Sequence, residues 1–157
     1  MKLKHANMGD SKDVYETITH YKDIFPHVRY DAICRRIKNG TCVWDHSVAI
    51  TYTEYKRKVE VGLDEDRRLP LFATKGDVMI HQIAAKRAGN GDAYVVMKKF
   101  IHDLHKGKRV WLTVRQDNHR ATKFYEKLNM NRVGVVYWMN GKLAGYVYCY
   151  DGTSKLL

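Results

Sequence analysis

Several kinds of residue that define specialised protein classes are scarce in this sequence. It has 2 prolines and 11 glycines among 157 residues, which excludes a collagen-like, proline-rich or linker-dominated chain. Its 3 cysteines, Cys34, Cys42 and Cys149, are odd in number and lack CxxC spacing, so neither a disulfide scaffold nor a clustered zinc site is expected. No apolar run reaches the length of a membrane span, and residues 1–5 lack the apolar core of a signal peptide. We therefore expect three reduced thiols, no metal and a cytoplasmic location.

Acidic residues are also scarce relative to basic ones. The chain has 17 Asp and Glu against 28 Lys and Arg, which gives a net charge of +11 and a pI near 9.6. A hydrophobic content of 45% is typical of a globular protein, so intrinsic disorder does not explain the charge. The excess of positive charge predicts an anionic partner, such as nucleic acid, a phosphorylated cofactor or an acidic membrane surface.

The apolar periodicity predicts helices and strands in mixed order, and the length suits a single domain over residues 1–157. Helices are expected from Asp10 or Ser11 to Phe25-Pro26, over residues 30–38, from Asp92 to Gly107 and from Asn118 to Leu128. Strands are expected over residues 2–6, 42–44, 48–53, 59–61, 78–85, 110–114, 132–139 and 142–150. Asn140-Gly141, between the last two strands, is a strong signal for a two-residue hairpin turn. These elements together predict a mixed α/β fold.

One strand-to-helix junction has the composition of an anion site. The strand over residues 78–85 runs into Lys86-Arg87-Ala88-Gly89-Asn90-Gly91, and Asp92 is expected to cap the helix that follows. Glycines let backbone N–H groups approach an anion, and the helix dipole adds partial positive charge. The loop lacks the Gly-Lys-Ser/Thr of a nucleoside-triphosphate loop and the third glycine of a dinucleotide fingerprint. By itself, the pattern fits phosphate binding and an ordinary tight turn equally well.

A second motif follows the next strand, Asn118-x-x-Ala121-x-x-Phe124-Tyr125-Glu126-Lys127. With both motifs the sequence resembles the GCN5-related N-acetyltransferase (GNAT) superfamily of acyl-CoA-dependent acyltransferases. That family has Gln/Arg-x-x-Gly-x-Gly/Ala at its pyrophosphate loop and Asn-x-x-Ala-x-x-Phe/Leu-Tyr-Glu-Lys on a later helix. The resemblance is specific over residues 78–130. The chain departs from the pattern in its shorter link from strand to loop, in Lys86 at the first loop position, and in the carboxylate of Asp92 beside the expected phosphates.

The resemblance implies a single GNAT-like α/β (mixed α+β) domain. Its central sheet would be mostly antiparallel, with a splayed pair of fourth and fifth strands and about four flanking helices. The implied cofactor is acetyl-CoA, a coenzyme A thioester, with backbone groups near residues 83–85 binding its pantetheine arm. The implied cofactor-binding residues are Ile83, Ala84, Ala85, Lys86, Arg87, Ala88, Gly89, Asn90, Gly91, Asp92, Ala93, Asn118 and Tyr125.

Acyl transfer to an amine proceeds by direct attack through a tetrahedral intermediate, and it needs a proton acceptor and a proton donor. The resemblance implies that Tyr125 protonates the leaving thiolate, while a core aromatic residue is the alternative interpretation. His81 is the candidate base, because an imidazole can accept a proton near neutral pH. A structural histidine, Glu60, Asp77 and a water relay are the alternatives. His102 and His105 lie one turn apart without a third ligand and are expected to be solvated, which again predicts no metal.

Two functions from different classes follow. The first is an N-acetyltransferase that acts on a primary amine of an unknown acceptor, including one carried on nucleic acid or on a nucleic-acid-associated protein. The alternative is a catalytically inactive, basic GNAT-like module that binds nucleic acid through a basic surface on its later helices. That surface comprises Lys98, Lys99, His102, His105, Lys106, Arg115, His119, Arg120, Lys123, Lys127 and Arg132. The aromatic and basic residues at 52–58 would suit an acyltransferase that acts on nucleic acid, and an exposed β-strand is the alternative interpretation of that stretch. Either would be a monomer or a homodimer without a membrane partner. Binding of acetyl-CoA separates the two hypotheses.

Overall fold

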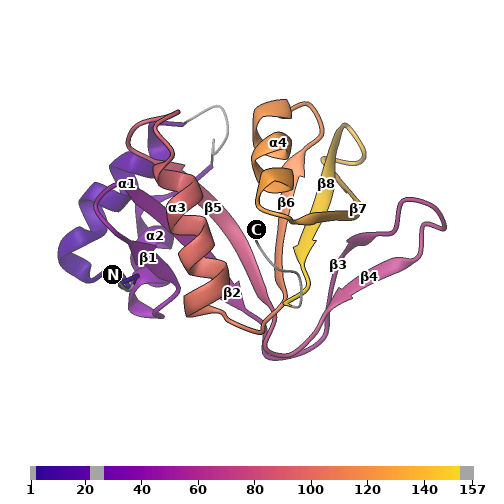
Figure 1. Cartoon of the computed structure of the whole chain (residues 1–157), viewed down its shortest axis with the longest axis horizontal. Helices are drawn as coiled ribbons and strands as arrows, with labels where there is room; N and C mark the ends of the chain where they lie inside the picture. The colour runs from indigo at the N-terminus through magenta and orange to yellow at the C-terminus, as the bar shows by residue number, and fades with distance from the viewer. Residues whose placement is uncertain (1–2, 22–26, 153–157) are drawn as a thin grey trace. The chain divides into compact units, whose positions relative to one another are not determined.

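A computed structural model describes residues 3–21 and 27–152 of the chain (Figure 1). The described residues form the α-helices α1 (Ser11–Thr19), α2 (Tyr30–Lys38), α3 (Asp92–Lys99) and α4 (His119–Lys127), with a 3₁₀ turn η1 (Met8–Asp10) and a π-helical turn η2 (Phe100–Leu104). The strands are β1 (Cys42–Trp44), β2 (Val48–Glu54), β3 (Val59–Leu63), β4 (Pro70–Ala73), β5 (Val78–Ala85), β6 (Val110–Arg115), β7 (Asn131–Trp138) and β8 (Leu143–Tyr150). The chain divides into two compact units, Met1–Thr53 with Ile80–Leu104 and Glu54–Met79 with His105–Leu157.

The first unit builds its core between two helices and the strands β1, β2 and β5, which are neighbours in that order. β1 and β2 form an antiparallel hairpin in which Cys42 pairs with Thr51. Helices α1 and α2 each place apolar residues four positions apart, so that one face of each helix is buried. The buried cluster comprises Ala6, Val14, Ile18, Ile33, Ile37, Cys42, Trp44, Ala49 and Ala84.

The second unit is an antiparallel sheet with the strand order β6-β8-β7-β3-β4. The β3–β4 hairpin joins the sheet where Leu63 pairs with Val135 of β7. A side chain at Gly134 would overlap the carbonyl oxygen of Leu63, so the close approach of the two strands requires glycine there. The buried cluster of this unit comprises Val61, Ala73, Met79, Trp111, Val147 and Cys149.

The elements with the strongest periodicity lie where the sequence predicts them. Helix α2 spans Tyr30–Lys38 and strand β5 spans Val78–Ala85, as expected. The expected strand over residues 2–6 is wrong in its described part, because His5 forms only an isolated bridge with Val43. Strand β4 was not expected. The expected end of the first helix at Phe25-Pro26 lies outside the described residues.

The connection between β7 and β8 differs from the expected two-residue turn. Trp138 pairs with Leu143, so the loop has four residues, and Met139, Asn140 and Gly141 all have positive φ, at 52°, 56° and 84°. The left-handed conformation is accessible to Asn and Gly at little cost, but not to most other residues. Met139 therefore adopts a conformation that the Asn-Gly signal does not predict.

A π-helical turn overturns one expectation about the third helix. The sequence predicts one continuous helix to Gly107 with Leu104 on its inner face, but η2 follows α3 from Phe100. A π turn takes more residues than an α turn, so the buried face moves along the chain. His105, expected to be solvated, is instead buried at 4% exposure, while Leu104 is only half-buried.

Candidate functional site

The junction between β5 and α3 has the backbone geometry of an anion-binding loop. After Ala85 ends the strand, the Lys86 N–H donates to the Ser47 carbonyl over 2.8 Å and fixes the start of the loop. Gly89 and Gly91 then have φ of 82° and 85°, a conformation that glycine adopts without a steric penalty. Gly91 is the N-cap residue of α3. The two glycines therefore turn the chain sharply into the helix.

This turn leaves several backbone donors without partners. The N–H groups of Ala88, Gly89, Gly91 and Ala93 make no hydrogen bond to any residue that the structure describes. A Cβ placed on Gly91 would meet no atom within 4 Å, so the space beside this glycine is open. Unpaired amides at the start of a helix attract a phosphate, because their dipoles and the helix dipole add. The loop is therefore fitted to hold a phosphorylated ligand.

Asp92 does not have the capping role that the sequence predicts. Gly91 is the N-cap and Asp92 is the first helical residue, so the expected cap is wrong. The Asp92 carboxylate accepts a hydrogen bond from Asn90 Nδ2 over 2.9 Å, and the Asp92 N–H donates to Asn90 Oδ1 over 3.1 Å. Because Asn90 engages the carboxylate, the carboxylate does not compete with a phosphate for the helix N–H groups.

Two basic side chains begin the loop, Lys86 and Arg87, and both are exposed. The Lys86 ammonium lies 5.3 Å from the centre of the Trp44 ring, where a cation is attracted to the aromatic face. Arg87 forms no ion pair with the described residues. Its guanidinium is therefore available for a bidentate contact with a phosphate.

The end of β5 is also held by Tyr21, a residue that neither sequence motif singles out. The hydroxyl of Tyr21 donates to the carbonyl of Ala85, the residue directly before the loop. The apolar ring follows the helical period of Val14 and Ile18, which predicts burial but says nothing of the hydroxyl. A tyrosine among aliphatic residues on such a stripe is the only available sequence signal, because a half-buried phenol usually bonds a polar partner.

His81, the candidate base, belongs to a chain of polar side chains on β5, β2 and α2. Its Nε2 atom lies 2.7 Å from Thr53 Oγ1, and Arg36 donates to the same hydroxyl oxygen over 2.7 Å. Protein atoms displace part of the hydration shell of the ring, and the Arg36 charge repels a proton; both lower the pKa of His81 to about 4. The imidazole is therefore neutral at pH 7, and Nδ1 is the nitrogen that remains for another partner.

Asp77 and Glu60, the alternative bases, have different surroundings. Asp77 is buried, and its Oδ2 accepts from the Trp111 indole over 3.0 Å and from the Thr74 N–H over 2.9 Å. Arg109 forms an ion pair with the same oxygen at 2.8 Å. These three contacts make Asp77 a structural anchor of the second unit. Glu60 is exposed on β3 opposite Phe72.

Tyr125, the candidate acid, lies on α4, which Asn118 begins. The Asn118 side chain accepts from the Ala121 N–H over 3.2 Å and caps the helix, as the sequence predicts. The Tyr125 ring packs between Phe124 and Tyr148, with ring centres 5.5 and 5.9 Å away. Its hydroxyl makes no hydrogen bond to a described residue, and burial raises its pKa to about 12. The hydroxyl therefore keeps its proton at neutral pH.

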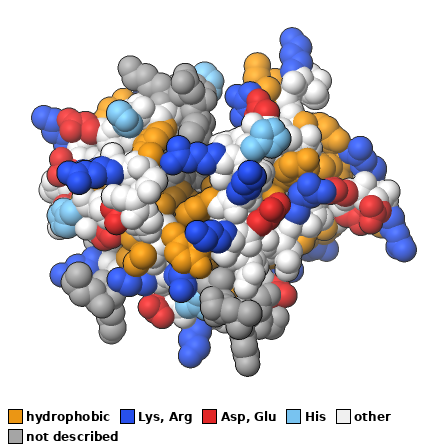
Figure 2. All heavy atoms as spheres, turned by 45° about the horizontal axis from the view of Figure 1, so that its top comes forward, with side chains coloured by type: hydrophobic (Ala, Val, Ile, Leu, Met, Phe, Trp, Pro, Cys, Tyr) orange, Lys and Arg blue, Asp and Glu red, His pale blue; other side chains and the backbone are white. Residues whose placement is uncertain are grey.

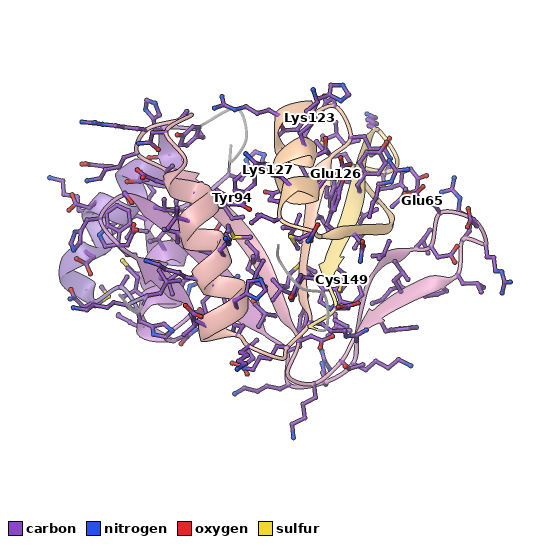
Figure 3. All side chains as sticks on the ribbon, viewed as in Figure 1. Glu65, Tyr94, Lys123, Glu126, Lys127 and Cys149 are labelled. Atoms are coloured by element: carbon purple, nitrogen blue, oxygen red, sulfur yellow. The ribbon has the colours of Figure 1, made fainter. Side chains whose placement is uncertain are left out.

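The neighbour of Tyr125 on α4 joins the helix to the sheet. Glu126, labelled in Figure 3 together with Lys123 and Lys127 of the same helix, accepts a hydrogen bond from the Tyr148 hydroxyl over 3.1 Å. Because Tyr148 also packs against the Tyr125 ring, this bond fixes the ring on which Tyr125 rests. Glu126 therefore positions Tyr125 indirectly, a role that the motif spacing alone does not reveal.

The remaining expectations concern thiols, metals and the membrane. Cys42 and Cys149 are buried, which raises the pKa of each thiol to about 12, while Cys34 is half-buried. Among the residues described, no group of three or more His, Cys, Asp and Glu side chains is arranged to bind a metal ion. No described helix combines the length and apolarity that crossing a bilayer requires. Figure 2 shows Lys and Arg side chains among acidic and apolar groups on one face of the molecule.

No protein-family model and no curated protein sequence matches the chain. Solved structures do match: a GNAT-family acetyltransferase of Streptococcus agalactiae has a TM-score of 0.71 at 14% identity, covering 94% of this chain and 93% of the other. NAA60 of Arabidopsis thaliana, in complex with acetyl-CoA, has a TM-score of 0.64 at 15% identity, covering 94% and 96%. The ribosomal-protein-S18-alanine N-acetyltransferase of Escherichia coli has a TM-score of 0.65 at 13% identity, covering 98% and 95%.

These matches define the fold class. The chain is a mixed α/β protein whose eight strands and four α-helices, counted over the described residues, have the arrangement of acetyltransferase structures. More particularly, it has the GNAT fold, which confirms the fold that the resemblance implies.

Proposed function

We propose that the chain is an N-acetyltransferase that transfers the acetyl group of acetyl-CoA to a primary amine. The observation that carries this proposal is the loop at residues 86–91, with its unpaired N–H groups and the open space beside Gly91. The GNAT fold supports it, and the structure of NAA60 with acetyl-CoA supports this choice of acyl donor. Acetyl-CoA would supply the activated acyl thioester.

In this proposal the loop binds the phosphates. The N–H groups of Gly89 and Gly91 donate to the pyrophosphate, and Arg87 adds a full positive charge beside them. Asn90 and Asp92 hold each other and so fix the turn. Ala88 and Ala93 contribute backbone donors, Lys86 contributes charge, and Asn118 retains a free amide donor. The backbone of Ile83, Ala84 and Ala85 binds the pantetheine arm.

Tyr125 is the proposed general acid. Because its pKa is about 12, its hydroxyl stays protonated at neutral pH and has a proton to donate to a leaving thiolate. The hydroxyl has no described partner to compete for that proton. Tyr125 is half-buried, whereas Tyr148, whose hydroxyl bonds Glu126, is fully buried. The Tyr125 hydroxyl is therefore available to a ligand, as the proposed role requires.

His81 is proposed to act in proton transfer, through Nδ1. The contact of Nε2 with Thr53 orients the ring, which is the arrangement by which a third group commonly fixes a catalytic histidine. A pKa of about 4 keeps the ring unprotonated but makes it a weak base, so in this proposal Nδ1 orients a water molecule by accepting its hydrogen bond, and that water passes the amine proton to solvent. Replacing His81 by Gln should lower turnover without changing the affinity for acetyl-CoA.

The proposed acceptor is an amine on a nucleic acid or on a protein associated with one. The net charge of +11 exceeds what the few phosphates of one cofactor neutralise. By its name, the E. coli enzyme with the same fold acts on an alanine of ribosomal protein S18, a protein of a nucleic-acid particle. Free-thiol release with purified protein, acetyl-CoA and a panel of amines, peptides and aminoacyl-tRNA would identify the acceptor class.

The direct test of the proposal is calorimetric titration with acetyl-CoA. Gly91→Val should abolish binding, because the new side chain fills the space beside the unpaired amides. Gly40→Val is the matched control: Gly40 also has positive φ, at 73°, and a Cβ there also meets nothing within 4 Å. Both substitutions strain the backbone, but only Gly91 lies in the loop. Absence of binding by the wild-type protein would refute the enzyme and favour the inactive nucleic-acid-binding module.

A further inference from the structure

Three turns of the second unit meet at one end of its strands (Figure 1). The Tyr55 N–H donates to the Asp77 carbonyl over 2.9 Å, and the Gly76 N–H donates to the Tyr55 carbonyl over 2.8 Å. The Val78 N–H donates to the Arg109 carbonyl over 2.9 Å. These bonds place residues 54–58, 74–77 and 106–109 side by side, and we call them the basic turn cluster.

The basic turn cluster concentrates positive charge. Its 13 residues include two acids, Glu54 and Asp77, and seven basic residues, so it carries +5 of the chain's net charge of +11. The seven are Lys56, Arg57, Lys58, Lys75, Lys106, Lys108 and Arg109. Glu54 pairs with Lys108 at 2.7 Å and Asp77 with Arg109 at 2.8 Å, so both carboxylates are already neutralised.

The other five basic residues of the cluster are exposed. None of them forms an ion pair with a described residue. Unpaired like charges held close together repel one another, and an anion that binds among them relieves that repulsion. One phosphate needs two or three cations, whereas five cations spread over adjacent turns suit a polymer with a phosphate at each repeat.

Aromatic residues distinguish this surface from a simple charge patch. Lys58 lies 4.2 Å from the centre of the Phe72 ring, which is 38% exposed at the edge of the cluster, and Tyr55 lies half-buried within it. Basic side chains beside exposed aromatic rings are typical of surfaces that bind single-stranded nucleic acid, since a base can stack on the ring. A membrane surface would require several large apolar side chains to insert, and Phe72 is the one large apolar side chain that the described residues expose beside the cluster.

We propose that the basic turn cluster binds single-stranded nucleic acid through its phosphodiester backbone. This goes beyond acetyl transfer and stands whether or not the chain transfers acetyl groups. Lys56, Arg57, Lys58 and Lys75 contact phosphates, and Phe72 offers a stacking surface. Backbone contacts of this kind give salt-dependent affinity with little sequence preference.

The test is the binding of short fluorescein-labelled single-stranded RNA and DNA, measured by fluorescence anisotropy over a range of KCl concentrations. The variant neutralises four cluster residues, as Lys56→Gln, Arg57→Gln, Lys58→Gln and Lys75→Gln. A matched control removes the same charge from exposed residues of the first unit, as Lys4→Gln, Lys12→Gln, Arg35→Gln and Lys38→Gln. All eight side chains are exposed, so both variants should fold, and their urea unfolding midpoints check this.

The cluster variant should lose about 100-fold or more in affinity near 0.1 M salt, and the slope of log K against log salt should become shallower by about 3. The control variant should keep the wild-type slope. Equal losses in the two variants would overturn the proposal, because net charge rather than the cluster would then govern binding. Salt-independent binding, no binding of either nucleic acid, or binding of anionic phosphatidylserine vesicles in preference to both would also overturn it.

Discussion

The buried carboxylate of Asp77 is expected to contribute strongly to the free energy of unfolding. One oxygen of its carboxylate receives the Trp111 indole N–H, the Thr74 N–H and the Arg109 guanidinium. The side chain is 8% exposed, whereas that of Arg109 is 36% exposed. Replacing Asp77 by Ala removes all three contacts while leaving each donor in place. The cost depends on which donors water can reach afterwards.

The three donors differ in how far water can reach them once the carboxylate is removed. The indole N–H of Trp111 is buried, at 4% exposure for the residue, and a buried donor left without an acceptor costs about 1–3 kcal/mol. The Thr74 N–H belongs to an exposed residue and loses one ordinary hydrogen bond, about 1 kcal/mol. Arg109 regains water and loses about 1 kcal/mol. Asp77→Ala should therefore lower the free energy of unfolding by about 3–5 kcal/mol, a large part of a typical 5–15 kcal/mol.

Asp117 provides the matched control. It pairs with Arg115 through the same atoms and at the same 2.8 Å as Asp77 with Arg109, but its side chain is 67% exposed. An exposed pair contributes about 0–1 kcal/mol, so Asp117→Ala should change little. Urea unfolding followed by tryptophan fluorescence measures both variants. Equal losses in the two would show that burial does not decide the strength of this contact.

Three further outcomes are expected. Tyr125→Phe should lower acetyl transfer about 100-fold or more while acetyl-CoA affinity in calorimetry stays the same, and unchanged turnover would exclude Tyr125 as the acid. Because folding lowers the pKa of His81 from 6.5 to about 4, the unfolded state binds more protons between these values, so stability should rise with pH over that window. His81→Gln should flatten this rise in urea titrations, and an unchanged slope would contradict the assignment. A thiol reagent should modify half-buried Cys34 first, with buried Cys42 and Cys149 protected until unfolding, as mass spectrometry would show; Cys34→Ser should remove the fast site.

Sequence patterns predict those helices and strands that are stabilised by contacts between residues a few positions apart. The apolar spacing of Ile33 and Ile37 and the Asn39-Gly40 stop define α2, because helix faces and caps depend on neighbours a few residues away. The same holds for Asn118, whose side chain bonds an N–H three positions along the chain. Strand β4 has a weak signal of its own, because it has only four residues and begins with a proline, and it is stabilised by pairing with β3.

In the candidate site, too, features decided by nearby residues could be predicted, and features decided by distant residues could not. The glycines of the loop and the Tyr125 motif are visible in sequence, because backbone conformation and helix position demand particular residue types there. The direction in which a side chain points is not visible. Asp92 turns to Asn90 instead of the helix amides, and His105 is buried because a π turn shifts the helical face. Tyr21 and Thr53 were missed because their partners, Ala85 and His81, lie far away in sequence.

The pairing of Leu63 with Val135 has a consequence for the timing of folding. On a growing chain, the β3–β4 hairpin is complete long before β7 has been synthesised. Until β7 arrives, the β3 edge presents unpaired backbone groups, which other chains can pair with. The newborn chain therefore has an unpaired β3 edge while residues 74–130 are being made, and slower synthesis of that segment would lengthen the interval.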